Sequence, residues 1–123
     1  MIIGIGVDRI ALARVEKSLR RFGDRFVRRI YTDLEYELSQ KKGVVRRLAM
    51  FFAAKEAVSK ALGTGFVGFG MKDIEISYQH SGKPVVILHA HAKQHAESLH
   101  VQTIHLSLTD DDGVAMAFAV IET

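Results

Sequence analysis

The stretch RRLAMFFAAKEAVSKALGTG, residues 46–65, is the most informative part of this 123-residue sequence. Its main apolar positions recur at helical spacing, and small or apolar residues fill most of the other faces, as expected of a buried helix. The pattern predicts a helix over residues 46–62 that ends at Gly63-Thr64-Gly65. The main apolar stripe is Phe51, Ala54, Val58, Ala61 and Leu62.

Beyond Arg46 and Arg47 at its start, this helix contains three charged residues: Lys55, Glu56 and Lys60. Glu56 and Lys60 are four residues apart and share a face, where an ordinary ion pair is one reading. Small alanines on the same face leave room for a ligand or a neighbouring chain. In the second reading the carboxylate holds a hard divalent cation, while the lysines bind phosphate oxygens.

The sequence before this helix predicts a strand followed by further helices. An apolar run over residues 2–7 indicates a short strand that ends at Asp8. Apolar residues then recur every three to four positions from Leu12 to Phe26, which predicts an amphipathic helix broken near Gly23. Residues 32–35 have the form of a capping box that begins another helix.

The sequence after the helix predicts mainly antiparallel strands. Residues 73–78 and 83–88 alternate around a turn, residues 91–100 form a short helix, and residues 101–109 alternate again. A turn at 110–113 precedes a last buried strand over 114–121. Helices come early and antiparallel strands late, so the fold class is α+β, with N-terminal helices packed on a small antiparallel sheet in one domain spanning 1–123.

The charge is distributed unevenly along the chain. Residues 1–60 contain 14 of the 17 Lys and Arg residues and half of the acidic ones, giving about +7, and the remaining residues carry about −4. Such a field attracts an acidic partner, which could be nucleic acid, a phosphate-rich cofactor or an acidic protein. Without cysteine, disulfides and thiolate chemistry are excluded. No apolar run reaches membrane-spanning length and no signal peptide is recognisable, so we expect a cytoplasmic protein.

Two further residues are candidates for chemistry. Asp8, beside two glycines, can reach a metal or ligand at the end of its strand, although an aspartate before a helix is more often an N-cap. His105 falls on the polar face of its strand, where a structural histidine is the usual case. His91 and His95 have the spacing of metal ligands but no accompanying H-E-x-x-H motif, which favours a surface position.

Several blocks of the sequence, in order, resemble the holo-[acyl-carrier-protein] synthase family of 4′-phosphopantetheinyl transferases. Residues 4–8 with Arg14 are similar to the opening signature of the family, and residues 52–65 match its second signature almost residue for residue. Residues 25–32 followed by Glu35, residues 82–84 and residues 105–108 are similar to other family blocks. The resemblance extends over essentially the whole chain.

The resemblance implies a magnesium-dependent transferase in which Asp8 and Glu56 bind Mg²⁺ and Glu56 and Lys60 are catalytic. Coenzyme A is the co-substrate, and a serine of apo acyl carrier protein receives 4′-phosphopantetheine for fatty acid biosynthesis. Adenosine 3′,5′-bisphosphate is released. The family also implies a homotrimer with active sites between subunits, and neither a nucleic-acid nor a membrane partner. The coenzyme would contact Arg47, Lys55, Lys60, Gly63, Gly65, Gly82, Lys83, Pro84 and His105, and the carrier protein would contact Arg14, Arg21, Arg25 and Arg29.

The sequence departs from the family pattern at two positions. Phe51 replaces a common arginine, and Asp110 stands where many members have a histidine. Phenylalanine can pack or stack on a base but cannot bind phosphate, so we expect Arg47, together with Arg46, to supply the charge for the coenzyme's 3′-phosphate. Two other classes of function are a small nucleic-acid-binding module, favoured by the arginines, and a non-catalytic trimeric scaffold. The strands lack the interleaved aromatics typical of RNA-binding modules.

Overall fold

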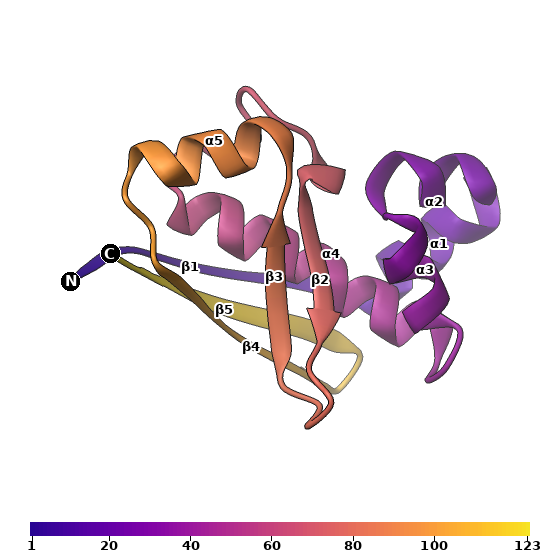
Figure 1. Cartoon of the computed structure of the whole chain (residues 1–123). Helices are drawn as coiled ribbons and strands as arrows, with labels where there is room; N and C mark the ends of the chain where they lie inside the picture. The colour runs from indigo at the N-terminus through magenta and orange to yellow at the C-terminus, as the bar shows by residue number, and fades with distance from the viewer.

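The computed structural model describes all 123 residues, as five strands, five α-helices and one 3₁₀ turn. Figure 1 shows their arrangement. In chain order the elements are β1 (Ile2–Ala11), α1 (Leu12–Phe22), α2 (Asp24–Ile30), α3 (Asp33–Ser39), α4 (Val44–Ala61), η1 (Met71–Asp73), β2 (Ile74–Tyr78), β3 (Pro84–Leu88), α5 (Ala90–Ser98), β4 (Thr103–Asp111) and β5 (Val114–Glu122).

The strands form two antiparallel sheets. The larger has the order β1-β5-β4, so the last strand lies in its centre, and β2 pairs with β3 in a separate hairpin. Alternation along β5 buries its alanines and Ile121 against α4. The opposite face of this sheet is open and strongly apolar, with Ile3, Ile5, Val7, Met116 and Phe118 all at least 40% exposed.

Helix α4 lies at the centre of the molecule and packs very closely on β1. A Cβ atom on Gly4 would lie 1.8 Å from the carbonyl oxygen of Ala61, and one on Gly6 would lie 1.9 Å from that of Ala57. Only glycine permits such an approach. The alanines of α4 that meet the strand are themselves buried, so small residues on both elements determine how the helix lies on the sheet.

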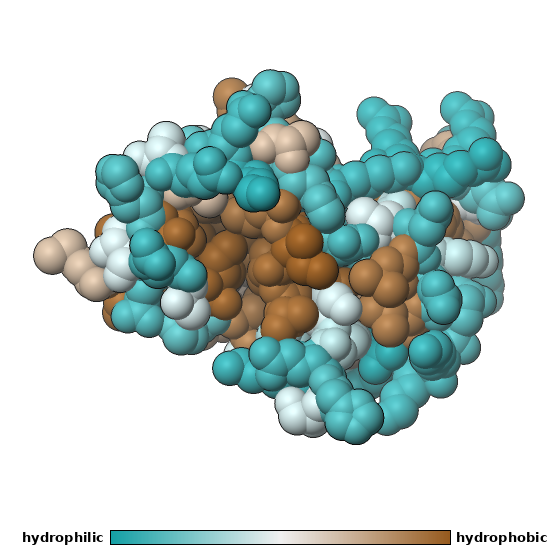
Figure 2. All heavy atoms as spheres, in the orientation of Figure 1, coloured by the Kyte–Doolittle hydropathy of each residue, from teal (hydrophilic) through white to brown (hydrophobic).

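The remaining elements surround α4. The β2–β3 hairpin crosses α4, and α5 covers one end of the hairpin (Figure 1). The helices α1, α2 and α3 lie beside one end of α4. On this face apolar residues collect around the hairpin, whereas hydrophilic residues cover most of the surface of α1 and α2 (Figure 2). None of the helices has the length and apolar character needed to cross a membrane.

The two ends of the described chain are neighbours. The backbone N–H of Thr123 donates a hydrogen bond of 2.9 Å to the carbonyl oxygen of Met1. Both termini therefore lie at the same end of the strands of the larger sheet, away from the helices α1–α3 (Figure 1).

The structure confirms the α+β class and most of the predicted elements. The break at Gly23 separates α1 from α2, and the capping box is present, with Thr32 and Glu35 each accepting a hydrogen bond from the other's backbone N–H. Gly63, with φ of +86°, follows the end of α4 as predicted. Two boundaries were wrong, because β1 continues to Ala11 instead of ending at Asp8, and β4 continues to Asp111, into the predicted turn at 110–113.

We expect Gly6→Ala to lower the free energy of unfolding by about 3 kcal/mol, because the new methyl group would push α4 away from β1. Chemical denaturation measures the change. Gly70→Ala is the matched control, since nothing lies within 4 Å of its Cβ position and its φ is −106°. Equal denaturation midpoints for the two variants would contradict the role assigned to the close packing.

Candidate active site

Asp8, Glu56 and Lys60 meet where β1 lies against α4. The ammonium group of Lys60 donates to the Asp8 carboxylate at 3.0 Å and to the carbonyl oxygen of Val7 at 3.1 Å. The Asp8 side chain is 19% exposed and the Lys60 side chain 51% exposed. The site is therefore a partly buried carboxylate beside an ammonium group that still reaches solvent.

Glu56 completes this group. Burial raises the pKa of Glu56, and the negative charge of Asp8 raises the pKa further, while Lys60 opposes the change. Two carboxylates thus share a partly desolvated site with a single lysine, so their charge is incompletely neutralised. An additional cation would relieve this repulsion.

The donor set fits Mg²⁺ better than a softer or more demanding metal. The structure contains no cluster of three or more His, Cys, Asp or Glu side chains, so no metal is enclosed entirely by protein ligands. Mg²⁺ usually takes one or two carboxylates and completes its octahedral shell with waters and substrate phosphates. Asp8 and Glu56 would be the residues that hold such an ion.

Two readings of these residues are corrected. Asp8 does not cap a helix: it lies inside β1, and α1 begins after Ala11 without a side-chain cap. Lys60 does not pair with Glu56 along the helix, because its ammonium group turns to Asp8 instead. Both corrections follow from the close approach of β1, which brings its carboxylate into reach of the lysine.

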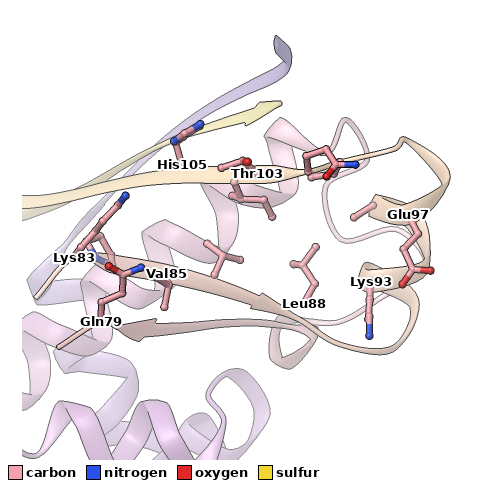
Figure 3. Close-up of a pocket in the computed structure, with 14 residues that line it drawn as sticks. Gln79, Lys83, Val85, Leu88, Lys93, Glu97, Thr103 and His105 are labelled. Atoms are coloured by element: carbon pink, nitrogen blue, oxygen red, sulfur yellow. The ribbon is translucent and has the colours of Figure 1, made fainter. Parts of the chain in front are cut away.

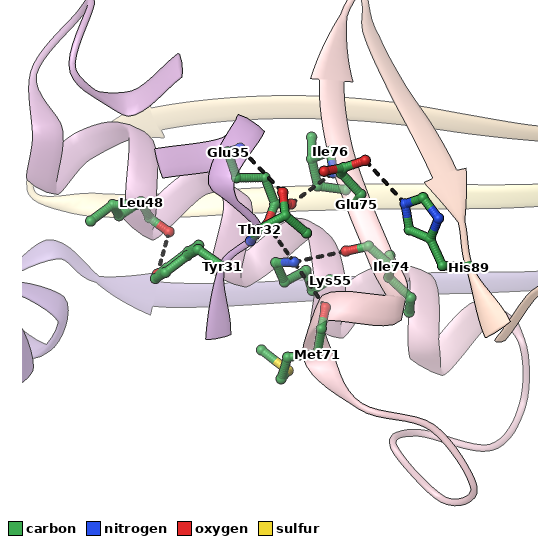
Figure 4. A network of polar contacts seen from close by, with 10 residues as sticks. All are labelled: Tyr31, Thr32, Glu35, Leu48, Lys55, Met71, Ile74, Glu75, Ile76 and His89. Atoms are coloured by element: carbon green, nitrogen blue, oxygen red, sulfur yellow. Dashed lines mark hydrogen bonds and ion pairs between the residues drawn. The ribbon is translucent and has the colours of Figure 1, made fainter. Parts of the chain in front are cut away.

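Lys55 points into the protein, toward Glu35 and the backbone of Met71 and Ile74 (Figure 4). Its side chain is completely buried, with Glu35 Oε1 at 2.7 Å and the carbonyl oxygens of Met71 and Ile74 at 2.8 Å each. Burial lowers the pKa of Lys55 and raises that of Glu35, and the ion pair opposes both changes. The expectation that Lys55 binds the coenzyme was wrong, since all three of its N–H donors have partners.

Several residues expected at the nucleotide end line a cavity between β3, β4 and α5 (Figure 3). Lys83, Pro84 and His105 belong to this cavity of about 430 Å³, together with apolar side chains such as Val85 and Leu88. His105 lies on the exposed face of β4, as predicted, and pairs with Glu122. The cavity combines apolar walls with cationic and hydrogen-bonding groups at its rim, a combination suited to a nucleotide.

A second cavity, of about 450 Å³, shares Pro84 with the first and contains Gly82 and Arg47. Lys42 and Arg46 also line it, so its character is strongly basic. The guanidinium of Arg47 lies 4.6 Å from the centre of the Tyr78 ring and donates to Leu38 O at 2.9 Å. Its buried Nε has no hydrogen-bond partner within the protein.

Phe51 is completely buried, with its ring centre 5.9 Å from that of Tyr78. Phe51 therefore contributes packing, which was one of its two predicted roles. It is not placed to stack on a base, which was the other. An arginine at position 51 would bring an uncompensated charge into the core. Asp110 receives a hydrogen bond from Arg46 at 2.8 Å, an interaction that the sequence did not indicate.

The carboxylate group and the nucleotide cavities do not meet within one chain. Asp8 lies on β1 and His105 on β4, which are opposite edges of the larger sheet. Neither nucleotide cavity contains Asp8, Glu56 or Lys60. Gly63 and Gly65 lie in the loop after α4, where they also line neither cavity.

The predicted carrier-protein residues form an exposed basic surface on α1 and α2. Arg14, Arg21, Arg25 and Arg29 are all exposed, whereas the ion pairs of these helices use Arg20 and Arg28. Arg25 and Arg29 also border a hollow of about 410 Å³ that contains Phe22 and Phe26. The surface therefore offers unpaired guanidinium groups around an apolar depression.

Sequence reasoning missed the role of Glu35, on α3, as the partner of Lys55. The sequence placed Glu35 in a capping box and in a family block but did not show this pairing; its second carboxylate oxygen accepts from Ile76 N–H at 2.7 Å. The available signal was Lys55 itself, because a lysine on a buried helix needs an acidic partner.

Comparison with known proteins shows the family of the chain. The family model described as the 4′-phosphopantetheinyl transferase superfamily matches residues 4–119. A holo-[acyl-carrier-protein] synthase from Vibrio cholerae is 48% identical, with 99% of this chain and 98% of the relative covered. The crystal structure of the Neisseria meningitidis holo-[acyl-carrier-protein] synthase superposes with a TM-score of 0.93 at 35% identity, covering both chains completely.

The Helicobacter pylori holo-[acyl-carrier-protein] synthase in complex with coenzyme A has a TM-score of 0.84 and 34% identity, covering 96% of this chain and 99% of that one. The chain belongs to the 4′-phosphopantetheinyl transferase superfamily, in the family of the holo-[acyl-carrier-protein] synthases. The resemblance read from the sequence motifs is confirmed, and an enzyme is favoured over a nucleic-acid-binding module or a scaffold.

Proposed function

We propose that this protein transfers 4′-phosphopantetheine from coenzyme A to a serine of apo acyl carrier protein. The observation that carries the proposal is the convergence of Asp8, Glu56 and Lys60, from two separate family motifs, at one partly buried site. The relatives named as holo-[acyl-carrier-protein] synthases and the coenzyme A complex of the Helicobacter pylori protein support it.

The reaction is a displacement at phosphorus. The serine oxygen bonds to the β-phosphorus of coenzyme A, the bond from that phosphorus to the bridging oxygen breaks, and adenosine 3′,5′-bisphosphate leaves with the electron pair. Mg²⁺ held by Asp8 and Glu56 would neutralise charge on the pyrophosphate. Lys60, anchored by Asp8 and Val7 but half exposed, can donate its remaining N–H to a phosphate oxygen.

The serine proton needs an acceptor. Glu56 is the nearest candidate, because its carboxylate shares the site with Asp8 and Lys60. It would take the proton directly or through one water. Most of the rate enhancement would come from positioning the two substrates and stabilising charge, as is general for phosphoryl transfer.

The nucleotide half of coenzyme A would occupy the two cavities that share Pro84. We assign the base and ribose to the cavity with Lys83 and His105, and the 3′-phosphate to the basic cavity with Arg46 and Arg47. Arg46, Arg47 and Lys42, which line that cavity, supply the positive charge that this assignment needs. The acidic carrier protein would dock on the exposed arginines of α1 and α2.

We also propose a homotrimer in which each active site combines the carboxylates of one chain with the nucleotide cavities of the next. Two observations support it: the halves of the site lie at opposite edges of one sheet, and the outer face of that sheet is apolar. Large apolar patches of this kind usually mark protein interfaces.

Incubating the protein with apo acyl carrier protein, coenzyme A and Mg²⁺ should add one phosphopantetheine to the carrier protein. Glu56→Gln should reduce the rate by at least about 100-fold, because it loses a charged ligand and the proton acceptor while keeping its shape. Intact-protein mass spectrometry follows the addition. A wild-type protein that leaves the carrier protein unmodified would exclude the proposed function, and near-normal turnover of Glu56→Gln at saturating Mg²⁺ would exclude the metal site.

Two arginine variants should each affect a different substrate, so each serves as the control for the other. Arg25→Glu should raise KM for the carrier protein about ten-fold, increasingly so at low salt, and leave KM for coenzyme A unchanged. Arg47→Ala should raise KM for coenzyme A about ten-fold and change KM for dephospho-coenzyme A much less, because one charge-assisted hydrogen bond is lost. Equal effects on both substrates would show a general structural role for either residue.

Two inactive variants should complement each other if sites form between chains. One is Glu56→Gln, and the other combines Lys83→Ala with His105→Ala. Co-expression should restore about a quarter of the sites, since each half of a site is intact with even odds in a randomly mixed ring. Activity no greater than the sum of the separate variants would place the whole site within one chain.

A further inference from the structure

The ammonium group of Lys55 connects three separate parts of the chain. It projects from α4 to Glu35 on α3, to the carbonyl oxygen of Met71 in η1 and to that of Ile74 at the start of β2, at 2.7, 2.8 and 2.8 Å (Figure 4). Three acceptors match the three donors of an ammonium group. The side chain therefore fixes its own position on α4 relative to each of these elements.

Glu35 extends the same connection into the hairpin. One carboxylate oxygen accepts from Thr32 N–H at 2.9 Å and from Lys55, and the other accepts from Ile76 N–H at 2.7 Å. The hairpin strand β2 is thus held at Ile74 through Lys55 and at Ile76 through Glu35. Both residues of the ion pair are completely buried, so no water competes for these hydrogen bonds.

The elements joined in this way carry the two halves of the proposed site. Glu56 follows Lys55 directly on α4, and the hairpin held at β2 carries Gly82, Lys83 and Pro84 at its turn and at the start of β3. A rotation of α4 that moved Lys55 would move Glu56 with it. In a symmetric trimer each chain would contribute Glu56 to one site and its hairpin to another, so a shift of α4 against the hairpin would disturb every site alike.

Stability alone is a poor reason for this arrangement. Replacing a buried ion pair with apolar residues of similar volume is often neutral or stabilising, because desolvation offsets much of the attraction between the charges. What apolar residues cannot replace is the direction of the three hydrogen bonds from Lys55 and of the bond from Ile76 to Glu35.

We propose that Lys55 and Glu35 are positioning residues of the transferase, which fix the Glu56 carboxylate relative to the β2–β3 hairpin of the same chain and so set the geometry of the two coenzyme A sites to which that chain contributes. This inference rests on the proposed function, since it takes Glu56 and the hairpin as the two ends of the coenzyme site. Lys55 acts through the backbone and touches no substrate.

The test compares three variants by their affinity for coenzyme A with Mg²⁺, measured calorimetrically without carrier protein, and by melting temperature. Lys55→Met keeps most of the length of the side chain but leaves the Glu35 carboxylate without its cation. The double variant Lys55→Met/Glu35→Leu removes both charges and replaces the ion pair with apolar side chains. Val58→Ala, a buried residue of the same helix without polar contacts, is the control for loss of stability alone.

Lys55→Met should melt at a lower temperature and bind coenzyme A about ten-fold more weakly, as when a partner that orients a metal ligand is lost. The double variant should regain most of the melting temperature and still bind about ten-fold more weakly. Val58→Ala should melt lower and bind coenzyme A as the wild type does. In turnover assays KM for coenzyme A should rise and kcat fall for both Lys55 variants, with KM for the carrier protein unchanged.

Wild-type affinity in the double variant would overturn the proposal, because stability would then explain all the effects of the pair. A loss of affinity in Val58→Ala equal to that in Lys55→Met would overturn it as well. Binding is measured separately from transfer, so the two proposals fail separately. A wild type that binds coenzyme A but does not modify the carrier protein refutes the proposed function, while the pattern of affinities across the variants still decides the positioning role.

Discussion

The contact between β1 and α4 determines most of this structure. Gly4 lies against the backbone of Ala61, and Gly6 lies against that of Ala57. A step of two residues forward along β1 therefore corresponds to about one turn backward along α4. A two-residue step on a strand covers about 6.6 Å and a helical turn about 5.4 Å, so the two repeats stay nearly in step over a short contact. Continuing the same face of the strand by two residues leads to Asp8, beside the turn that carries Glu56 and Lys60. The glycines that allow the close packing therefore also place the carboxylates together.

The same contact explains which parts of the structure sequence reasoning could predict. Elements defined by local periodicity or capping, such as α4, the α3 capping box and the alternation of β4, were predicted correctly because their signals lie within a few residues. The end of β1 was misplaced because the polar residues Asp8 and Arg9 resemble the end of a strand. Their inclusion depends on pairing with β5, more than a hundred residues away.

The candidate site shows the same division. Motifs indicated that Asp8, Glu56 and Lys60 belong together, and the structure brings them to one place. The direction of Lys55 could not be read from its position beside Glu56, because adjacent helical residues point about 100° apart and only the fold shows which one faces inward. The position of the Phe51 ring could not be read from the sequence either, because the ring packs beside Tyr78, which belongs to the β2–β3 hairpin.

The neighbouring chain ends have a consequence for topology. Because Thr123 is hydrogen-bonded to Met1, the chain is almost a closed ring, and a short linker could join the ends while the chain is reopened elsewhere. Such a circular permutant could begin in an exposed loop without interrupting any of the five strands. In such a permutant the central strand β5 would no longer be the last strand to be synthesised. The order in which the strands are made could then be changed while their pairing in the sheet stays the same.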